Sequence, residues 1–216
     1  MKVLVAGAHG KTARRLVRML VEDGHEVRGL VRKEEQMPDV EADGAEPVLV
    51  DLEEEGVGAV GQAVDGCDAV IFAAGAGPGS GAARKETMDY AGAVKLVEAA
   101  EQHSARRYLM LSSMGAGDPE SGSEAMRPYL RAKARADERL QESGLDYTII
   151  RPGSLTDEEG AGRIEAAESL GRRGEISRAD VARTFAEALE VENTYRKSFV
   201  TSVDAPALTL TVVAVK

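Results

Sequence analysis

An apolar stretch, a glycine turn and the start of a helix follow one another at the N-terminus, and this order limits the folds open to the chain. Val3 to Ala6 is apolar, Gly7 and Gly10 flank the turn, and Ala13 is the next small residue. Glycine has no Cβ, so the chain can bend sharply and bring backbone N–H groups close to an anion. The helix adds the positive end of its dipole. We interpret Gly-x-x-Gly-x-x-Ala as a phosphate-binding turn, although it departs from Gly-x-Gly-x-x-Gly; an ordinary strand-to-helix turn is the alternative.

Apolar strands alternate with helical segments along most of the chain. Strands are predicted at residues 3–6, 25–31, 46–50, 69–72, 107–111 and 147–150. Helices are predicted from Ala13 to Gly24 and at residues 57–64, 85–102, 128–142 and 179–189, with short strands toward the C-terminus. This alternation predicts an α/β fold with a Rossmann-type, doubly wound parallel sheet that helices cover on both faces. We expect one domain over residues 1–216, in which about residues 154–216 form a small lid on the substrate side.

The composition disfavours several classes of function. With 37 Asp and Glu against 27 Lys and Arg, the net charge is −10, whereas general nucleic-acid binding needs a basic surface. There is no apolar run of about 18 residues and no signal-peptide pattern, so we expect a cytoplasmic protein. The single cysteine, Cys67, is expected to be a buried apolar residue rather than a nucleophile. The three histidines lack metal-ligand spacing, and no Gly-x-Ser-x-Gly occurs, so neither a metal site nor a hydrolase is predicted.

Small or polar residues follow almost every predicted strand at its carboxyl end. These clusters are Gly7–Gly10, Arg32–Lys33, Asp51–Leu52, Ala73–Gly75, Ser112–Ser113 and Pro152–Gly153. Ligands of open α/β sheets bind beyond the carboxyl ends of the strands, and parallel strands bring those ends to one edge. The clusters therefore predict a single ligand site at that edge.

Arg32 and Lys33 follow the second strand, where an NAD site carries an acidic residue that binds the ribose 2′-hydroxyl. An arginine instead binds a 2′-phosphate with two parallel hydrogen bonds. The pair therefore favours NADP over NAD. The alternative is a surface Arg-Lys pair, which the nearby Glu34 and Glu35 would neutralise.

Asp51 and Leu52 end the third strand, where an adenine ring would rest. The carboxylate of Asp51 is suited to accept a hydrogen bond from the adenine amine, and Leu52 to cover one ring face. The alternative for Asp51 is a cap that accepts a backbone N–H at the start of a helix.

Tyr129 and Lys133 are four residues apart on a predicted helix and therefore share a face. An ammonium near a phenol lowers the pKa of the phenol from about 10 toward neutrality, and the phenol then exchanges a proton with a carbonyl or alcohol oxygen. Lys133 would also hold the nicotinamide ribose, and Ser113 would orient the same substrate oxygen. The alternative is an aromatic core residue beside a lysine whose stem packs on the surface.

Taken together, these motifs resemble the short-chain dehydrogenase/reductases, and more closely their atypical NAD(P)-binding members of the epimerase/dehydratase group. The resemblance covers nearly the whole chain and rests on Gly7-x-x-Gly10-x-x-Ala13, Ala73-Ala74-Gly75, Ser112-Ser113, Tyr129-x-x-x-Lys133 and the run from Ser143 to Gly153. Asp89 matches the position where this subgroup carries Asp in place of the usual active-site Asn. The stretch from Ile176 to Ala182 is similar to the start of the subgroup's C-terminal helix.

The resemblance implies a role for each motif. Ser113, Tyr129 and Lys133 would be catalytic. The turn and the helix start would bind the pyrophosphate, Arg32 the 2′-phosphate, and Pro152, Gly153 and Ser154 would lie near the nicotinamide amide. The full set expected to bind the cofactor is Gly7, His9, Gly10, Lys11, Thr12, Arg32, Lys33, Asp51, Leu52, Ala73, Ala74, Gly75, Ser112, Lys133, Pro152, Gly153 and Ser154.

The leading hypothesis is an NADP(H)-dependent oxidoreductase that acts on a small carbonyl or alcohol, or on a quinone-like or flavin-like acceptor. One alternative is a sugar epimerase or dehydratase, which the short segment after Gly153 disfavours, because such enzymes place a larger lobe over the substrate. Others are a flavin or biliverdin-type reductase that needs no tyrosine, and a non-enzymatic NADP sensor. We expect a monomer or homodimer whose partner is a small molecule, with no nucleic acid, membrane or metal involved.

Overall fold

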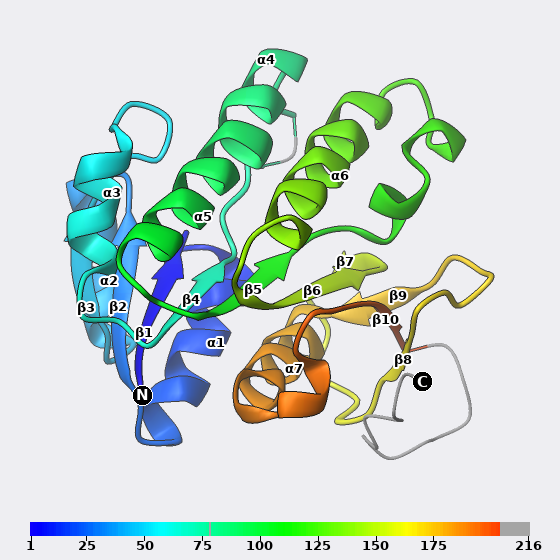
Figure 1. Ribbon diagram of the computed structural model, residues 1–216. Coiled ribbons are helices and arrows are strands. Elements are labelled where there is room, and N and C mark those ends of the chain that lie inside the picture. Colours follow the sequence, from blue (N-terminus) through cyan, green and yellow to red (C-terminus); the bar gives the residue numbers. More distant parts are fainter. Residues whose placement is uncertain (78, 204–216) are drawn as a thin grey trace.

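The computed structural model describes residues 1–77 and 79–203, and an eight-stranded sheet forms its centre (Figure 1). The strand order is β3-β2-β1-β4-β5-β6-β10-β8; neighbouring strands are parallel except β8, which runs antiparallel to β10. The strands are β1 (Lys2–Ala6), β2 (Glu26–Val31), β3 (Glu46–Leu49), β4 (Ala69–Phe72), β5 (Arg107–Leu111), β6 (Asp146–Pro152), β8 (Glu165–Ala167) and β10 (Lys197–Ser202). The predicted doubly wound sheet is confirmed.

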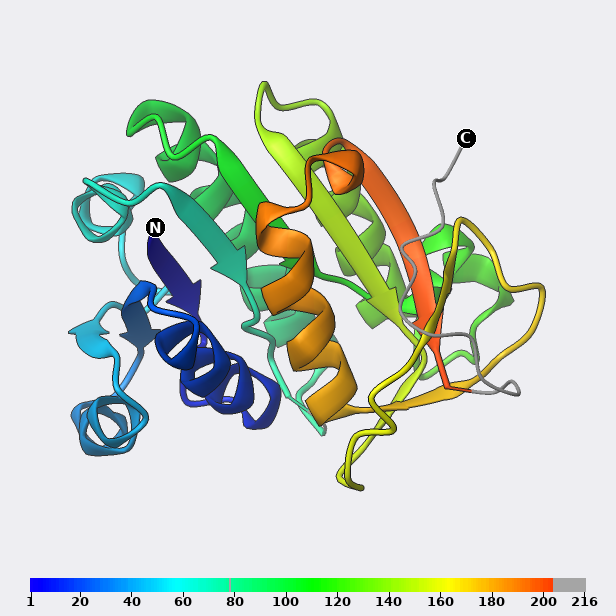
Figure 2. The same cartoon turned by 90° about the horizontal axis from the view of Figure 1, so that it is seen from below.

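Helices cover both faces of the sheet, as near-continuous apolar strands require. Figure 2 shows α1 and α7 side by side on one face, where they pack on the core that includes Val5, Ile71 and Leu109. The other face carries α3, α5 and α6 over a second core that includes Phe72 and Met110. The helices are α1 (Lys11–Glu22), α2 (Met37–Ala42), α3 (Val57–Val64), α4 (Ala82–Arg84), α5 (Ala93–Gln102), α6 (Arg127–Gln141) and α7 (Arg178–Glu190).

The strand order changes direction along the chain at β1, which lies between β2 and β4. Such a switch point opens a crevice at the carboxyl ends of the strands, and the glycine turn lies there. Gly7 has a φ of 76°, and a Cβ at this position would lie 2.6 Å from the Cα of Ala74. Only glycine therefore lets the turn after β1 approach the segment after β4 this closely.

Two helical details differ from the sequence prediction. The predicted helix at residues 85–102 begins as the π-helical segment η2 (Lys85–Gly92) before it continues as α5. A wider turn changes which side chains face inward, and π-helical turns are frequent at functional sites. A short helix, α2, also forms in the polar stretch before β3, for which no helix was predicted. Cys67 is buried, as expected.

The segment after Gly153 contributes more than a lid. In its described part, α7 packs against α1, and β10 and β8 extend the central sheet. The short pair β7 (Ser154–Thr156) and β9 (Glu175–Ser177) forms a separate two-stranded sheet. Residues 204–216, also part of the predicted lid, lie outside the described residues. No helix in the described part of the chain is long and apolar enough to span a membrane.

Candidate functional site

A cleft of about 1030 Å³ opens at the carboxyl edge of the sheet. It brings together most of the residues that the sequence placed in one site. The predicted residues that line it are Gly7, His9, Gly10, Lys11, Thr12, Arg32, Leu52, Ala73, Ala74, Gly75, Ser112, Tyr129 and Lys133. Those that do not line it are Lys33, Asp51, Ser113, Pro152, Gly153 and Ser154.

The start of α1 fits a phosphate group. Gly10 precedes the helix and offers no capping side chain, and the first turn contains no acidic residue. The first N–H groups of a helix have no partner within it, and they carry the positive end of the dipole. Gly7, Gly10 and Thr12 line the cleft at this point. The backbone here can therefore hold the pyrophosphate of a dinucleotide.

An ion bridge joins two cations of the cleft lining near this helix start. The carboxylate of Asp157, just after β7, accepts hydrogen bonds from Lys11 Nζ at 2.6 Å and Arg178 Nη1 at 2.9 Å. These two cations, the first residues of α1 and α7, both line the cleft. They hold the pKa of Asp157 below its usual range, with the hydrogen bond from Lys11 as the largest cause. Two cations thus lie where an anionic ligand would meet both helix starts.

Arg32 lines the cleft at the end of β2, as predicted for a 2′-phosphate ligand. Its guanidinium lies 3.9 Å from Glu53, which also binds Arg84 at 2.8 Å. The expected neutralising residues, Glu34 and Glu35, form no ion pair with Arg32 among the described residues. Because 39% of the Arg32 side chain is exposed, it is free to reorient toward a ligand.

His9 and Asp51 were both predicted to bind the cofactor, and only His9 lines the cleft. His9 lines the cleft, and its ring contacts Asp39 at 2.8 Å and Gln36 at 3.4 Å. Asp51 lies outside the lining, and its carboxylate accepts the backbone N–H of Glu53 at 2.8 Å. This contact closes a turn before α3, whose N-cap is Gly56, so Asp51 does not take the helix-capping role that was its alternative; Leu52 alone of this predicted pair lines the cleft.

Lys133 is a buried cation on α6, with 3% of its side chain exposed. Its Nζ lies 3.4 Å from Oδ1 of Asp89, which is 1% exposed, and donates a 3.0 Å hydrogen bond to the carbonyl of Leu111. Asp89 also accepts the backbone N–H of Ala76 at 3.4 Å. Asp89 therefore connects η2, the glycine-rich loop after β4 and Lys133. This direct ion pair is a contact that an Asn in its place could not make.

Tyr129 lies one helical turn before Lys133 and faces the cleft. Ser113, just outside the lining, forms a hydrogen bond with it. The pKa of Tyr129 is raised above 10.0, mainly by burial and further by Asp89, although Lys133 and Ser113 lower it. The predicted shift toward neutrality is therefore wrong in its net direction for this protein without a ligand. The sequence shows the charged neighbour, but not the loss of water around the phenol.

Behind this pair, Asp137 connects three elements of the fold. It is buried on α6 one turn after Lys133, and accepts hydrogen bonds from Ser112 Oγ at 2.8 Å and Arg151 Nε at 2.9 Å. Burial raises the pKa of Asp137, although Arg151 and Ser112 lower it. Ser112, expected to bind the cofactor, lines the cleft but directs its hydroxyl hydrogen bond to Asp137. The network fixes α6 against the ends of β5 and β6.

The run from Pro152 to Ser154 does not reach the cleft. Gly153 donates its N–H to the carbonyl of Thr201 and Ser154 to that of Gly174, so the segment is held toward β10 and β9. Leu155 lines the cleft instead. The expected contact of residues 152–154 with the nicotinamide amide stays a prediction.

Sequence reasoning missed six cleft residues that matter for charge and shape: Gln36, Lys85, Met88, Met126, Leu155 and Arg178. Arg178 lies in the stretch that resembles the start of the subgroup's C-terminal helix, and that resemblance predicts no ligand contact for it. Lys85 and Met88 lie on η2, where the π-helical turn changes the facing that an α-helical pattern predicts. Within the described residues, no group of three or more His, Cys, Asp or Glu could hold a metal ion.

Comparison with known proteins agrees with the fold and identifies the family. Residues 7–192 match the family model described as NAD(P)H-binding, so the chain belongs to this NAD(P)H-binding family. A Bacillus subtilis protein named as an uncharacterised sugar epimerase, YhfK, is 44% identical over 95% of this chain and 96% of its own length. Sanguinarine reductase from Eschscholzia californica is 28% identical over 91% and 87%.

A solved structure is similar over the whole fold. The Bacillus halodurans protein, named as an NAD-dependent epimerase/dehydratase, is 42% identical, has a TM-score of 0.90, and matches 95% of this chain and 96% of that chain. The relatives' names thus include both epimerases and a reductase. The family and its nucleotide-binding fold are shown by these matches, whereas the reaction has to be argued from the site.

Proposed function

We propose that this protein is an NADP(H)-dependent reductase of the short-chain dehydrogenase/reductase type, with a small carbonyl, quinone or flavin-like acceptor. The observation that carries the proposal is that Tyr129 and Lys133 line the same cleft as the glycine turn, with Ser113 beside Tyr129 just outside the lining. A cofactor side and a proton-donating side thus share one cavity. When bound, NADPH supplies the hydride.

The residues around the turn bind and orient the cofactor. The backbone at Gly7 and Gly10 and the start of α1 hold the pyrophosphate. Arg32 binds the 2′-phosphate, and its guanidinium leaves Glu53 to do so. This preference for NADP over NAD rests on Arg32. Lys133 is held by Asp89 and Leu111 in a position from which it can also bind a ribose hydroxyl.

Tyr129 donates the proton in the reduction direction. A raised pKa keeps its phenol protonated at neutral pH, ready to protonate a substrate oxygen as negative charge develops there. Ser113 orients the same oxygen, and Lys133 stabilises the phenolate that remains. The reverse reaction needs a phenolate base, which the raised pKa disfavours.

An epimerase is the second candidate, because two close relatives carry that name. Sugar epimerisation begins with oxidation of an alcohol, so Tyr129 would have to act as a base before it acts as an acid. The name of the Eschscholzia californica relative agrees with reduction. A non-enzymatic NADP sensor would need the phosphate-binding residues alone.

The test measures NADPH consumption with a panel of aldehydes, quinones and flavins. We expect turnover by the wild type and a loss of about 100-fold or more in Tyr129→Phe, which keeps the ring but removes the proton donor. Tyr90→Phe is the matched control, because Tyr90 packs under Arg135 outside the cleft lining. Full turnover by Tyr129→Phe contradicts the assignment, and tight NADP binding without any turnover favours the sensor.

A further inference from the structure

The cleft is basic although the protein is acidic. Its lining includes five Lys or Arg side chains but one carboxylate, while the whole chain has a net charge of −10. The five cations are Lys11, Arg32, Lys85, Lys133 and Arg178, and the carboxylate is Asp89. Charges of one sign in a cleft raise the local concentration of ligands of the opposite sign. The cleft is therefore built for anions.

Four of these cations have an assignment within the proposed function. Lys133 is paired with Asp89. Arg32 is assigned to the 2′-phosphate, and Lys11 and Arg178, joined by Asp157, are assigned to the pyrophosphate at the start of α1. Lys85 is the remaining cation.

Lys85 lies on the side of the cleft where the reaction would occur. It is the first residue of η2, and its Nζ lies 5.1 Å from the centre of the Tyr129 ring. The same ammonium donates a 2.8 Å hydrogen bond to the carbonyl of Gly77. No carboxylate of residues 1–77 or 79–203 forms an ion pair with it. An ammonium has three donors, so Lys85 keeps donors for a ligand beside Tyr129.

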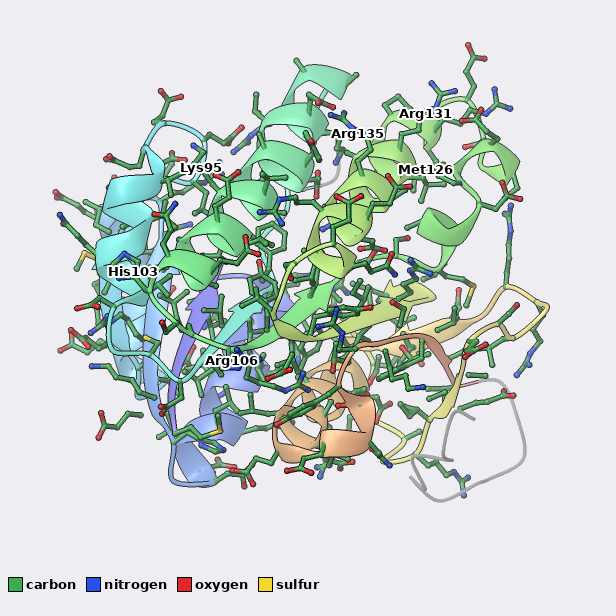
Figure 3. All side chains as sticks on the ribbon, viewed as in Figure 1. Lys95, His103, Arg106, Met126, Arg131 and Arg135 are labelled. Carbon is green, nitrogen blue, oxygen red and sulfur yellow. The ribbon has the colours of Figure 1, made fainter. Side chains whose placement is uncertain are left out.

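Apolar side chains line the same cleft as this ammonium. Met88, Ala125 and Met126 line the same part of the cleft. Met126 precedes α6 (labelled in Figure 3), and 46% of its surface is exposed, an unusual exposure for a large apolar residue. Flexible thioether side chains fit flat or irregular apolar ligands. The wall beside Tyr129 thus combines an apolar surface with one available positive charge.

We infer that the acceptor of this reductase is an anion: an aromatic or otherwise apolar aldehyde, ketone or quinone that carries a carboxylate. The inference rests on the proposed function of the site. Lys85 binds the carboxylate while the reducible oxygen meets Tyr129 and Ser113. In the reduction of an aldehyde, hydride from NADPH forms the new C–H bond and the Tyr129 proton forms the O–H bond. The products are an alcohol and NADP⁺, and the carboxylate is unchanged.

The experiment compares each acid with its neutral ester. The probes are para-formylbenzoate and a carboxylated naphthoquinone, each beside its methyl ester, and the readout is the ratio of kcat/KM for acid over ester. We expect the wild type to prefer the acids by about 10-fold or more, as a charge-assisted hydrogen bond supports. Lys85→Met should bring the ratio close to one, and Lys85→Arg should restore much of it.

Lys95→Met is the matched control. Lys95 follows η2 on α5 and likewise donates to loop carbonyls, those of Glu53 and Glu55, but outside the cleft lining (labelled in Figure 3). Its loss should leave the acid-to-ester ratio unchanged. A merely structural Lys85, which only holds the loop through Gly77, predicts equal losses for acid and ester in Lys85→Met.

A binding measurement separates the two ways of failing. Calorimetry with para-formylbenzoate and its ester, on the protein with and without NADP⁺, is expected to show acid binding that weakens about 10-fold in Lys85→Met. Equal binding or turnover of acid and ester by the wild type overturns the anionic acceptor and leaves the reductase intact. Lys85-dependent binding of the acid without turnover of any acceptor keeps the anion site and overturns the reductase.

Discussion

Carboxylates near the two ends of the cleft have pKa values that are shifted in opposite directions. At the phosphate end, formed by Lys11, Arg32, Arg178 and their partners, the pKa of Asp157 is lowered by a hydrogen bond from Lys11. At the chemical end, formed by Tyr129, Lys133, Asp89 and Asp137, burial raises the pKa of Asp137. Both ends bring cations and carboxylates together. They differ in how much water reaches the charges.

This difference separates a binding surface from a fixed framework. Exposed ion pairs contribute little to stability, so a phosphate can replace Asp157 at small cost. A buried pair such as Lys133–Asp89 has lost its water, and neither partner can leave without exposing the other to an apolar interior. The phosphate end is thus suited to exchange its anions, and the chemical end to hold a proton donor in place.

The largest predicted effect is a loss of stability on removal of the buried cation Lys133, compared with removal of the exposed cation Lys11. Lys133→Met leaves Asp89 buried without its partner and should cost about 3–5 kcal/mol of unfolding free energy. Lys11→Met, at an exposed pair, should leave the urea midpoint unchanged without ligand. Urea unfolding of both variants checks this. Similar losses for the two would remove the distinction between the ends.

Loss of Arg32 should act on affinity rather than stability. Arg32→Ala is expected to weaken NADP binding by about 10- to 100-fold, since it removes charged hydrogen bonds to the 2′-phosphate, with little change for NAD. Lys33→Ala is the control, because Lys33 is the adjacent cation outside the cleft lining. Calorimetry gives all the affinities. Equal wild-type affinity for NADP and NAD would contradict the assignment.

Opposite pKa shifts predict opposite dependence of stability on pH. The pKa of Asp137 is raised in the folded protein. Its contribution to the free energy of unfolding is therefore present at low pH and is lost as the pH rises through this folded-state pKa. The pKa of Asp157 is lowered in the folded protein. Its contribution to the free energy of unfolding is therefore present at neutral pH and is lost as the pH falls through the folded-state pKa. Urea midpoints of the wild type, Asp137→Asn and Asp157→Asn across the acidic range test the two slopes. Slopes of the same sign for both residues count against the comparison.

The smallest effect concerns competition at the phosphate end. Asp157→Asn removes the anion that binds Lys11 and Arg178, so the variant should bind inorganic pyrophosphate and NADPH a few-fold more tightly at low salt. The gain should disappear at high salt. Weaker binding in Asp157→Asn would instead show that the bridge positions the two cations for the ligand.

The phosphate end could be predicted in position but not in its partners. Parallel strands bring the residues at their carboxyl ends together, so the glycine turn and Arg32 were predictable from apolar periodicity and turn residues. Asp157 lies 146 residues from Lys11, and no local pattern joins them. Glu53, rather than the sequence-adjacent Glu34 and Glu35, lies near Arg32 for the same reason.

At the chemical end, the residue types were predictable but the electrostatics were not. The four-residue spacing placed Tyr129 and Lys133 on one face, and the structure agrees. The sign of the Tyr129 pKa shift depends on burial, which only the packed structure shows. Lys85 was missed because hydrophobic periodicity does not reveal a π-helical turn. Long-range packing and desolvation therefore could not be predicted from the sequence.

The central claim is that hydride transfer and proton donation by Tyr129 occur in this one cleft. The most direct test uses NADPH that carries deuterium at both C4 positions of the nicotinamide, with para-formylbenzoate as acceptor, followed by mass spectrometry and NMR of the product. We predict that the wild type places one deuterium on the new alcohol carbon and that Tyr129→Phe forms this product at least about 100-fold more slowly. Product without deuterium, or equal rates in the two proteins, would contradict the account.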